Sequence, residues 1–110
     1  MTAQAAINEV NNVLPHNFDN NLLLTWINRI ERTASVEIEG MECDAIGDIS
    51  ENDLEKPLRI PDPYSVIYVL FLQCMIAISL GEFDRYSNIY GIFNASWSDY
   101  AKWHLRKRGK

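Results

Sequence analysis

The side chains most able to do chemistry, two histidines and two cysteines, stand apart from one another in the sequence. His16 follows a proline, and His104 falls in a row of aromatic residues, with no second histidine or cysteine close to either. Cys43 and Cys74 are widely separated and match no metal-ligand spacing. We therefore predict no metal site and no cofactor.

Acidic residues supply a second possible chemistry, because oxygen ligands suit calcium. A calcium loop starting at Asp48 fails, since Asp53 stands where the loop needs glycine and Arg59 where it needs the closing glutamate. The chain also has no phosphate-binding glycine loop and no nucleophile elbow. These residues predict a binding or structural protein and not an enzyme.

Charge is divided between two runs of single sign within a net charge of -5. The first run holds eight acids and no base: Glu37, Glu39, Glu42, Asp44, Asp48, Glu51, Asp53 and Glu55. The second holds five bases and no acid: Lys102, Arg106, Lys107, Arg108 and Lys110. Such a division is typical either of two contact surfaces or of two solvated segments.

The length of the chain and its apolar spacing predict one all-α domain over residues 1–110. We expect a small bundle of about four helices. We expect helices over residues 3–14, from a cap at Asp19 onward, from Pro63 to Leu80 with Asp62 as cap, and over 83–106. Residues 35–60 read as a long acidic loop, and the sequence SVEIE within it alternates like a short strand or extended arm. Its apolar residues suggest that it lies against its own domain or a neighbour.

The third helix carries no charge from Ser65 to Leu80. A helix over residues 64–80 is about 25 Å long, whereas a bilayer core needs about 30 Å, so a buried helix is the better interpretation. Because it is apolar on nearly all sides, three neighbouring helices would leave part of it uncovered. We take this as an indication of self-association.

The last helix has an aromatic seam with spacings of 4, 3, 4, 3 and 4: Tyr86, Tyr90, Phe93, Trp97, Tyr100 and His104. One-sided spacing predicts packing against the apolar helix. The alternative is a stacking platform for single-stranded nucleic acid. The aromatic residues expected in the core or in contacts between subunits are Tyr64, Tyr68, Phe71, Tyr86, Tyr90, Phe93, Trp97 and Tyr100.

Several short motifs occur in a fixed order. PDPYS spans Pro61–Ser65, GEFDRY spans Gly81–Tyr86 and is followed by Asn88, FNA spans Phe93–Ala95, and KW is Lys102–Trp103. With the opening VNNVLPHNFDNNLLLTWINRIE, this order resembles a family of small tailed-phage and prophage proteins, the head–tail connector or head-completion proteins.

The resemblance implies a structural subunit of the virion, made in the host cytoplasm and placed at the head–tail interface. About a dozen copies would form a ring, because a head-to-tail contact that closes gives one. The ring would dock on the portal protein, extend the channel for passing double-stranded DNA without reading its sequence, and present a face to the next neck or tail-completion protein. No membrane is expected as a partner.

Within this resemblance, the two charged runs receive hypothetical roles. The basic tail, residues 105–110, and the residues just before it would bind the portal: Lys102, Trp103, Arg106, Lys107, Arg108 and Lys110. The acidic loop would face the channel or a neighbouring subunit: Glu37, Glu39, Glu42, Asp44, Asp48, Glu51 and Asp53. The alternative function is a small nucleic-acid-binding or regulatory helical phage protein, which predicts salt-sensitive DNA binding.

Overall fold

The computed structural model describes residues 1–42 and 47–108 and is built from four α-helices. They are α1 (Ala3–Val13), α2 (Asn20–Thr33), α3 (Val66–Ser79) and α4 (Phe83–Arg108). The described residues contain no strand, so the predicted all-α class is confirmed.

Local signals set the helix starts and one helix end. The Thr2 side chain accepts a hydrogen bond from the Ala5 N–H at 3.1 Å and caps α1. Asp19 caps α2 by accepting from the Asn21 N–H at 3.1 Å, as the sequence predicts. Gly81 follows α3 with φ of 75°, a left-handed conformation that favours glycine at a helix end.

The start of α3 differs from the prediction. Residues 62–65 form a turn, and the helix begins only at Val66, so Pro63 is not its first residue. Asp62 does not cap the helix backbone; it accepts a hydrogen bond from the Ser65 hydroxyl inside the turn. α4 runs to Arg108 and is longer than predicted, since its 26 residues give a rod of about 39 Å.

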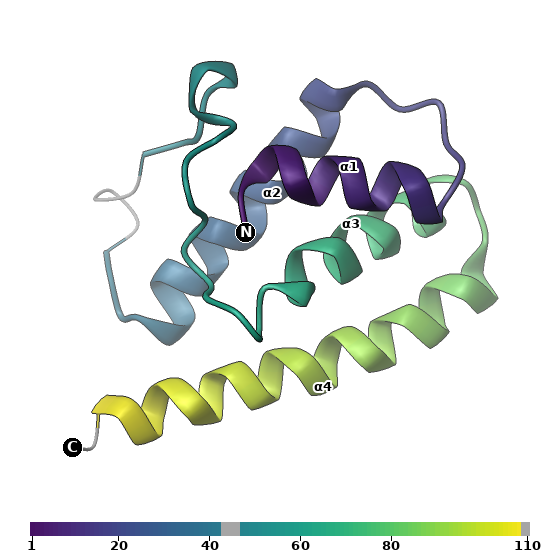
Figure 1. The fold of residues 1–110 in the computed structure, drawn as a ribbon. Helices are drawn as coiled ribbons and strands as arrows, with labels where there is room; N and C mark the ends of the chain where they lie inside the picture. The colour runs from purple at the N-terminus through teal and green to yellow at the C-terminus, as the bar shows by residue number, and fades with distance from the viewer. Residues whose placement is uncertain (43–46, 109–110) are drawn as a thin grey trace.

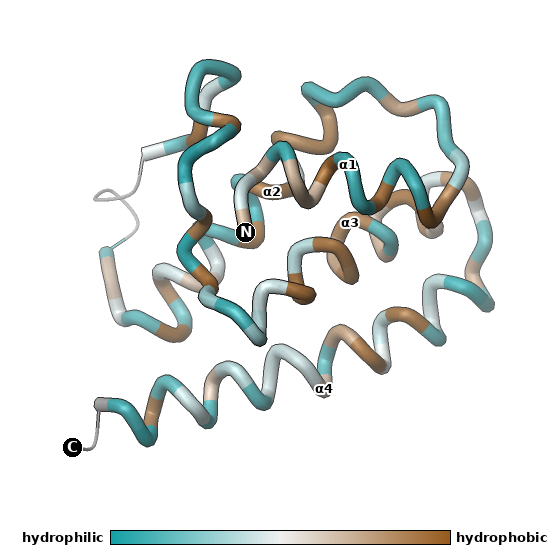
Figure 2. The backbone as a smooth tube through the Cα atoms, in the orientation of Figure 1, coloured by the Kyte–Doolittle hydropathy of each residue, from teal (hydrophilic) through white to brown (hydrophobic). Residues whose placement is uncertain are grey.

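The core lies where α1, α2 and α3 meet, and α4 packs along α3 (Figure 1). α3 is coloured mostly as hydrophobic in Figure 2, whereas α4 is mixed along its length. Residues from three helices form the centre: Ile7, Val10, Leu23, Ile27, Ile67, Tyr68, Leu72 and Ile76. The chain itself therefore covers most of α3, although Val66 and Ile78 stay 44% and 40% exposed.

The predicted strand at SVEIE is wrong, because Ala34–Ile38 form a π-helical turn, η1, that continues α2. The Glu39 N–H donates to the Ala34 carbonyl at 3.1 Å. Ala34 and Ile38 follow Ile30 at intervals of four, and all three are buried, so they extend the buried stripe of α2. The burial of this helical stripe therefore outweighs the alternating pattern, and no strand forms here.

Residues 47–60 are irregular apart from one short 3-10 turn, η3 (Glu51–Asp53), but they do not form a free arm. The Leu58 N–H donates to the Met1 carbonyl at 2.8 Å, and the Gln4 N–H donates to the Leu54 carbonyl at 3.1 Å. Asn28 of α2 holds Ile49 by two hydrogen bonds, of 2.7 and 3.0 Å. The predicted extended arm is thus not confirmed, and this segment lies against its own domain.

Membrane spanning was the other interpretation of the apolar helix. Among the described residues, no helix combines the length and the apolar character that crossing a bilayer requires.

Candidate functional site

The aromatic seam forms a continuous ladder of rings along α4. Neighbouring ring centroids are 5.5 to 6.5 Å apart, a separation at which aromatic pairs attract. The members in order are Tyr86, Tyr90, Phe93, Trp97 and Tyr100, and His104 meets Tyr100 edge-on at 6.2 Å. Phe71 of α3 lies 5.7 Å from Phe93, so the ladder joins the two helices.

Burial of the ladder favours packing over nucleic-acid stacking. Phe93 and Tyr100 are only 9% and 2% exposed, and Tyr90 is the one ladder residue classed as an exposed large apolar side chain. A stacking platform needs ring faces open to the bases. The ladder therefore packs the α3–α4 hairpin, and its two most buried rings are closed to nucleic acid.

Tyr64 connects the start of the hairpin to its far end. Its ring lies 5.7 Å from the ring of Tyr100 and 5.5 Å from the ring of Trp103. Trp103 also stacks on Tyr100 at 6.0 Å. These three rings fix the last turns of α4 against the turn that precedes α3.

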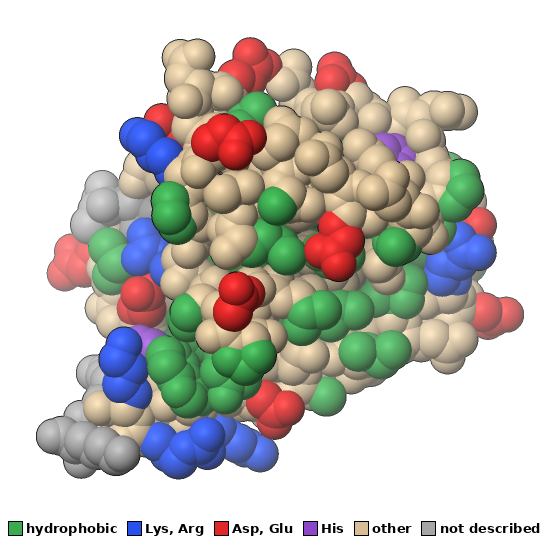
Figure 3. Space-filling view, viewed as in Figure 1, with side chains coloured by type: hydrophobic (Ala, Val, Ile, Leu, Met, Phe, Trp, Pro, Cys, Tyr) green, Lys and Arg blue, Asp and Glu red, His purple; other side chains and the backbone are tan. Residues whose placement is uncertain are grey.

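The basic end of α4, which we define as Lys102–Lys107, includes Trp103 of this aromatic contact and continues past it. Lys102, Arg106 and Lys107 are exposed, and within the described part of the chain none of them has an acidic partner. Lys107 Nζ lies 5.2 Å from the centre of the Trp103 ring, a cation–π contact. Figure 3 shows Lys and Arg side chains gathered at this end of α4. The structure does not describe the Arg108 side chain or Lys110.

The acidic segment, which we define as residues 37–55, is partly neutralised by bases that flank it. Glu39 pairs with Arg59 at 2.8 Å, Asp48 with Arg32 at 2.5 Å, and Asp53 with Lys56 at 2.8 Å. The Asp53–Lys56 pair lowers the pKa of the Asp53 carboxyl and raises that of Lys56. Four acids remain exposed without an ion pair among the described residues: Glu37, Glu42, Glu51 and Glu55. Asp44 lies outside the described residues.

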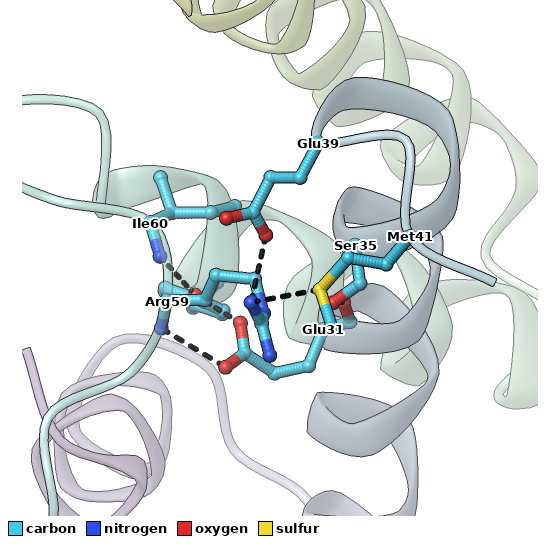
Figure 4. A network of polar contacts seen from close by, with 7 residues as sticks. Glu31, Ser35, Glu39, Met41, Arg59 and Ile60 are labelled. Atoms are coloured by element: carbon cyan, nitrogen blue, oxygen red, sulfur yellow. Dashed lines mark hydrogen bonds and ion pairs between the residues drawn. The ribbon is translucent and has the colours of Figure 1, made fainter. Parts of the chain in front are cut away.

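A buried carboxylate, Glu31, fastens the chain that follows this segment, at Arg59 and Ile60, to the core (Figure 4). One oxygen of Glu31 accepts from the Arg59 backbone N–H at 3.0 Å, and the other accepts from the Tyr68 hydroxyl. The Tyr68 oxygen in turn accepts from the Ile60 N–H at 2.7 Å. Burial raises the pKa of Glu31 above its usual value and raises that of Tyr68 strongly.

Glu31 is an acidic residue of α2 that no sequence motif singles out, and the structure shows it buried. A signal was present, because Glu31 lies four residues after Ile27 and so falls within the buried stripe. A carboxylate in such a stripe needs hydrogen-bond donors. The donors come from Arg59 and Tyr68, which are 28 and 37 residues away, and the local pattern could not identify them.

A surface recess of about 550 Å³ lies away from both charged regions, beside the α1–α2 loop and Leu80. His16 lines it, and its Nδ1 accepts from the Phe18 N–H at 3.0 Å. The other ring nitrogen therefore carries the hydrogen and donates to Asn11. These two hydrogen bonds of His16 stabilise the α1–α2 loop. Across the residues described, no three His, Cys, Asp or Glu side chains gather to hold a metal ion.

Comparisons with protein-family models, with curated proteins and with solved structures find no match to this chain. The sequence motifs and the geometry above therefore provide the basis for a functional proposal.

Proposed function

We propose that this chain is a structural subunit of a phage head–tail connector ring, which docks on the portal and extends the DNA channel toward the tail. Support comes first from the ordered motifs that resemble the connector family, which run from Pro61 to Trp103. In the proposed ring, about a dozen copies meet through heterologous contacts that close. The ring would be part of the virion.

The observation that carries the proposal is the contact between the first and last of these motifs. PDPYS contributes Tyr64 and KW contributes Trp103, and their rings lie 5.5 Å apart. Between them, Tyr86 and Phe93 of the two middle motifs belong to one ladder. The motif aromatics therefore build a single structural unit, the α3–α4 hairpin with its basic end.

The charged regions suggest how such a subunit would be oriented. We assign the basic end of α4 to an acidic surface of the portal, because Lys102, Arg106 and Lys107 lack acidic partners within the described residues. We assign the unpaired acids Glu37, Glu42, Glu51 and Glu55 to the channel wall or to the next subunit. On a channel wall these acids would repel phosphate and keep passing DNA from adhering.

Co-sedimentation with the portal encoded in the same genome tests the portal contact. We expect the wild-type protein to travel with the portal in a density gradient, and Lys102→Glu combined with Arg106→Glu to remain at the top. Arg29→Glu is the matched control, since Arg29 is an exposed base on α2. Co-sedimentation of the double variant at the wild-type level would remove the basic end from the portal contact.

The same variants separate this proposal from nucleic-acid binding. Neutralisation of phosphates makes DNA affinity fall steeply as salt rises. We expect filter binding of double-stranded DNA to stay at background in low salt for both the wild type and the double variant. Tight, salt-sensitive binding that the double variant loses would favour the nucleic-acid alternative.

A further inference from the structure

Among the described residues, the two most exposed large apolar side chains lie at opposite ends of α4. Phe83 and Leu105 are each 65% exposed, and Tyr90 between them is 43% exposed. At about 100° per residue, these three side chains lie within about 60° of one another around the helix. We call this set the outer row of α4. Phe83 and Leu105 are about 33 Å apart along the axis.

The outer row borders the aromatic face that packs on α3, and Tyr90 belongs to both. Phe93 and Tyr100, the most buried residues of that face, point about a quarter turn away from the outer row. Ser87, Asn94 and Ser98 lie between the apolar ends of the row and are exposed. These shorter side chains would let a second helix approach α4 between its apolar ends.

Charges of opposite sign accompany the two ends of the row. Asp84 and Lys102 are both exposed and are 18 residues apart, which is about five helical turns, so they lie on the same side of α4. Each suits its own helix end, since acids favour the N-terminus and bases the C-terminus. That preference does not explain the exposed apolar residue near each of them.

We infer that the outer row of α4 is the docking surface for α4 of a second copy, arranged antiparallel about a two-fold axis near Asn94. Phe83 and Leu105 are equally distant from Asn94 in sequence, so each Phe83 would lie against Leu105 of the other copy. Asp84 lies ten residues before Asn94 and Lys102 eight after it, so Asp84 would lie within about one helical turn of Lys102 of the other copy. Each copy supplies both halves of each contact, as a symmetric dimer requires.

This inference does not depend on the proposed connector function. It concerns the free protein, and it occupies Lys102, one of the bases assigned to the portal. Pairing of α4 and docking on a portal would therefore exclude each other. In the pair, Lys102 would be occupied until a portal is present.

Sedimentation equilibrium of the full chain without portal tests the pairing. We expect the wild type to have twice the chain mass at about 100 µM, and Leu105→Ser or Phe83→Ser to weaken association by about tenfold or more, because each change removes an apolar contact. Ile92→Ser is the matched control, since Ile92 is 55% exposed on the opposite side of α4. Circular dichroism would confirm that each variant is folded. A monomeric wild type, or equal weakening by Ile92→Ser, would overturn the inference.

Crosslinking tests the two-fold axis itself. In a Cys43→Ser background, Asn94→Cys should form a disulfide-linked dimer on oxidation, whereas Ile92→Cys should not. Asp84→Lys should weaken pairing, and adding Lys102→Asp should restore it by exchanging the charges. An Asn94→Cys variant that stays monomeric under oxidation would rule out the antiparallel arrangement, as would a charge exchange without recovery.

Discussion

Two regions of the molecule carry the same kind of sequence signal, a run of single-sign charge, yet fold differently. The acidic segment is held by its own domain, through Arg32, Lys56 and Arg59. The basic end of α4 extends past the aromatic contact at Trp103 and meets no acid among the described residues.

The difference shows that a charge run alone does not identify a contact surface. Three acids of the acidic segment contribute to the fold of the chain itself, and four others among the described residues remain without an ion pair. At the basic end, exposed bases and exposed Leu105 occur together. The basic end is therefore the better candidate for a contact with another protein.

The largest expected effect on stability is at Glu31, beneath the acidic segment. Glu31→Ala leaves the Arg59 N–H and the Tyr68 hydroxyl without their acceptor, at about 1–3 kcal/mol each, while removal of a buried charge offsets part of this cost. We expect a net loss of about 2 kcal/mol in the free energy of unfolding, measured by urea denaturation. Glu37→Ala, on an exposed acid, should stay within about 0.5 kcal/mol. Equal effects of the two changes would contradict the anchoring role of Glu31.

The pH dependence of stability gives a second test of the same group. The folded-state pKa of Glu31 is raised above its ordinary value of 4.5, so the folded protein holds this proton more tightly than the unfolded chain does. Its contribution to stability is fully present below pH 4.5 and is lost as pH rises through the folded pKa. Wild type should therefore lose stability relative to Glu31→Gln between pH 4.5 and neutrality. A difference that stays constant over this range would contradict the raised pKa.

A smaller effect is expected at the ion pair between Arg59 and Glu39. The two side chains are 31% and 25% exposed, so water screens their attraction in part. Arg59→Met should lower the free energy of unfolding by about 1 kcal/mol. Asp48→Asn should cost less, about 0.3 kcal/mol, because the pair with Arg32 is more exposed. The reverse ranking in thermal denaturation would show that exposure does not set the strength of these pairs.

A small effect on stability is also expected at the basic end of α4. Lys102→Glu with Arg106→Glu breaks no ion pair within the described chain, so it should change the free energy of unfolding by only about 0.5 kcal/mol through the helix dipole. The same variant should lose portal binding. A large loss of stability would instead give these bases a role in the fold and would weaken the contrast between the two regions.

The sequence predicts the helices well because their signals are local. Apolar spacing identifies α1, α2 and α4, and Asp19 and Gly81 mark helix ends. The strand prediction fails at SVEIE, residues 35–39, because alternation and helical spacing coincide over so short a stretch. The placement of the acidic segment depends on distant partners such as Asn28 and Met1, which no local pattern reveals.

The candidate site, like the fold, is predicted from the sequence where local patterns determine it and not where distant contacts do. The aromatic seam and its packing against the apolar helix follow from periodicity, and the structure confirms that packing through Phe71 and Phe93. The distinction between paired and unpaired charges does not follow from periodicity. It requires knowing which bases the fold brings to Glu39 and Asp48.

Electron microscopy of the purified protein mixed with the portal from the same genome tests the proposed function most directly. We predict a ring of this protein on one end of the portal, continuous with its channel, and no ring with Lys102→Glu combined with Arg106→Glu. Bare portals in the presence of folded wild-type protein would contradict the connector proposal.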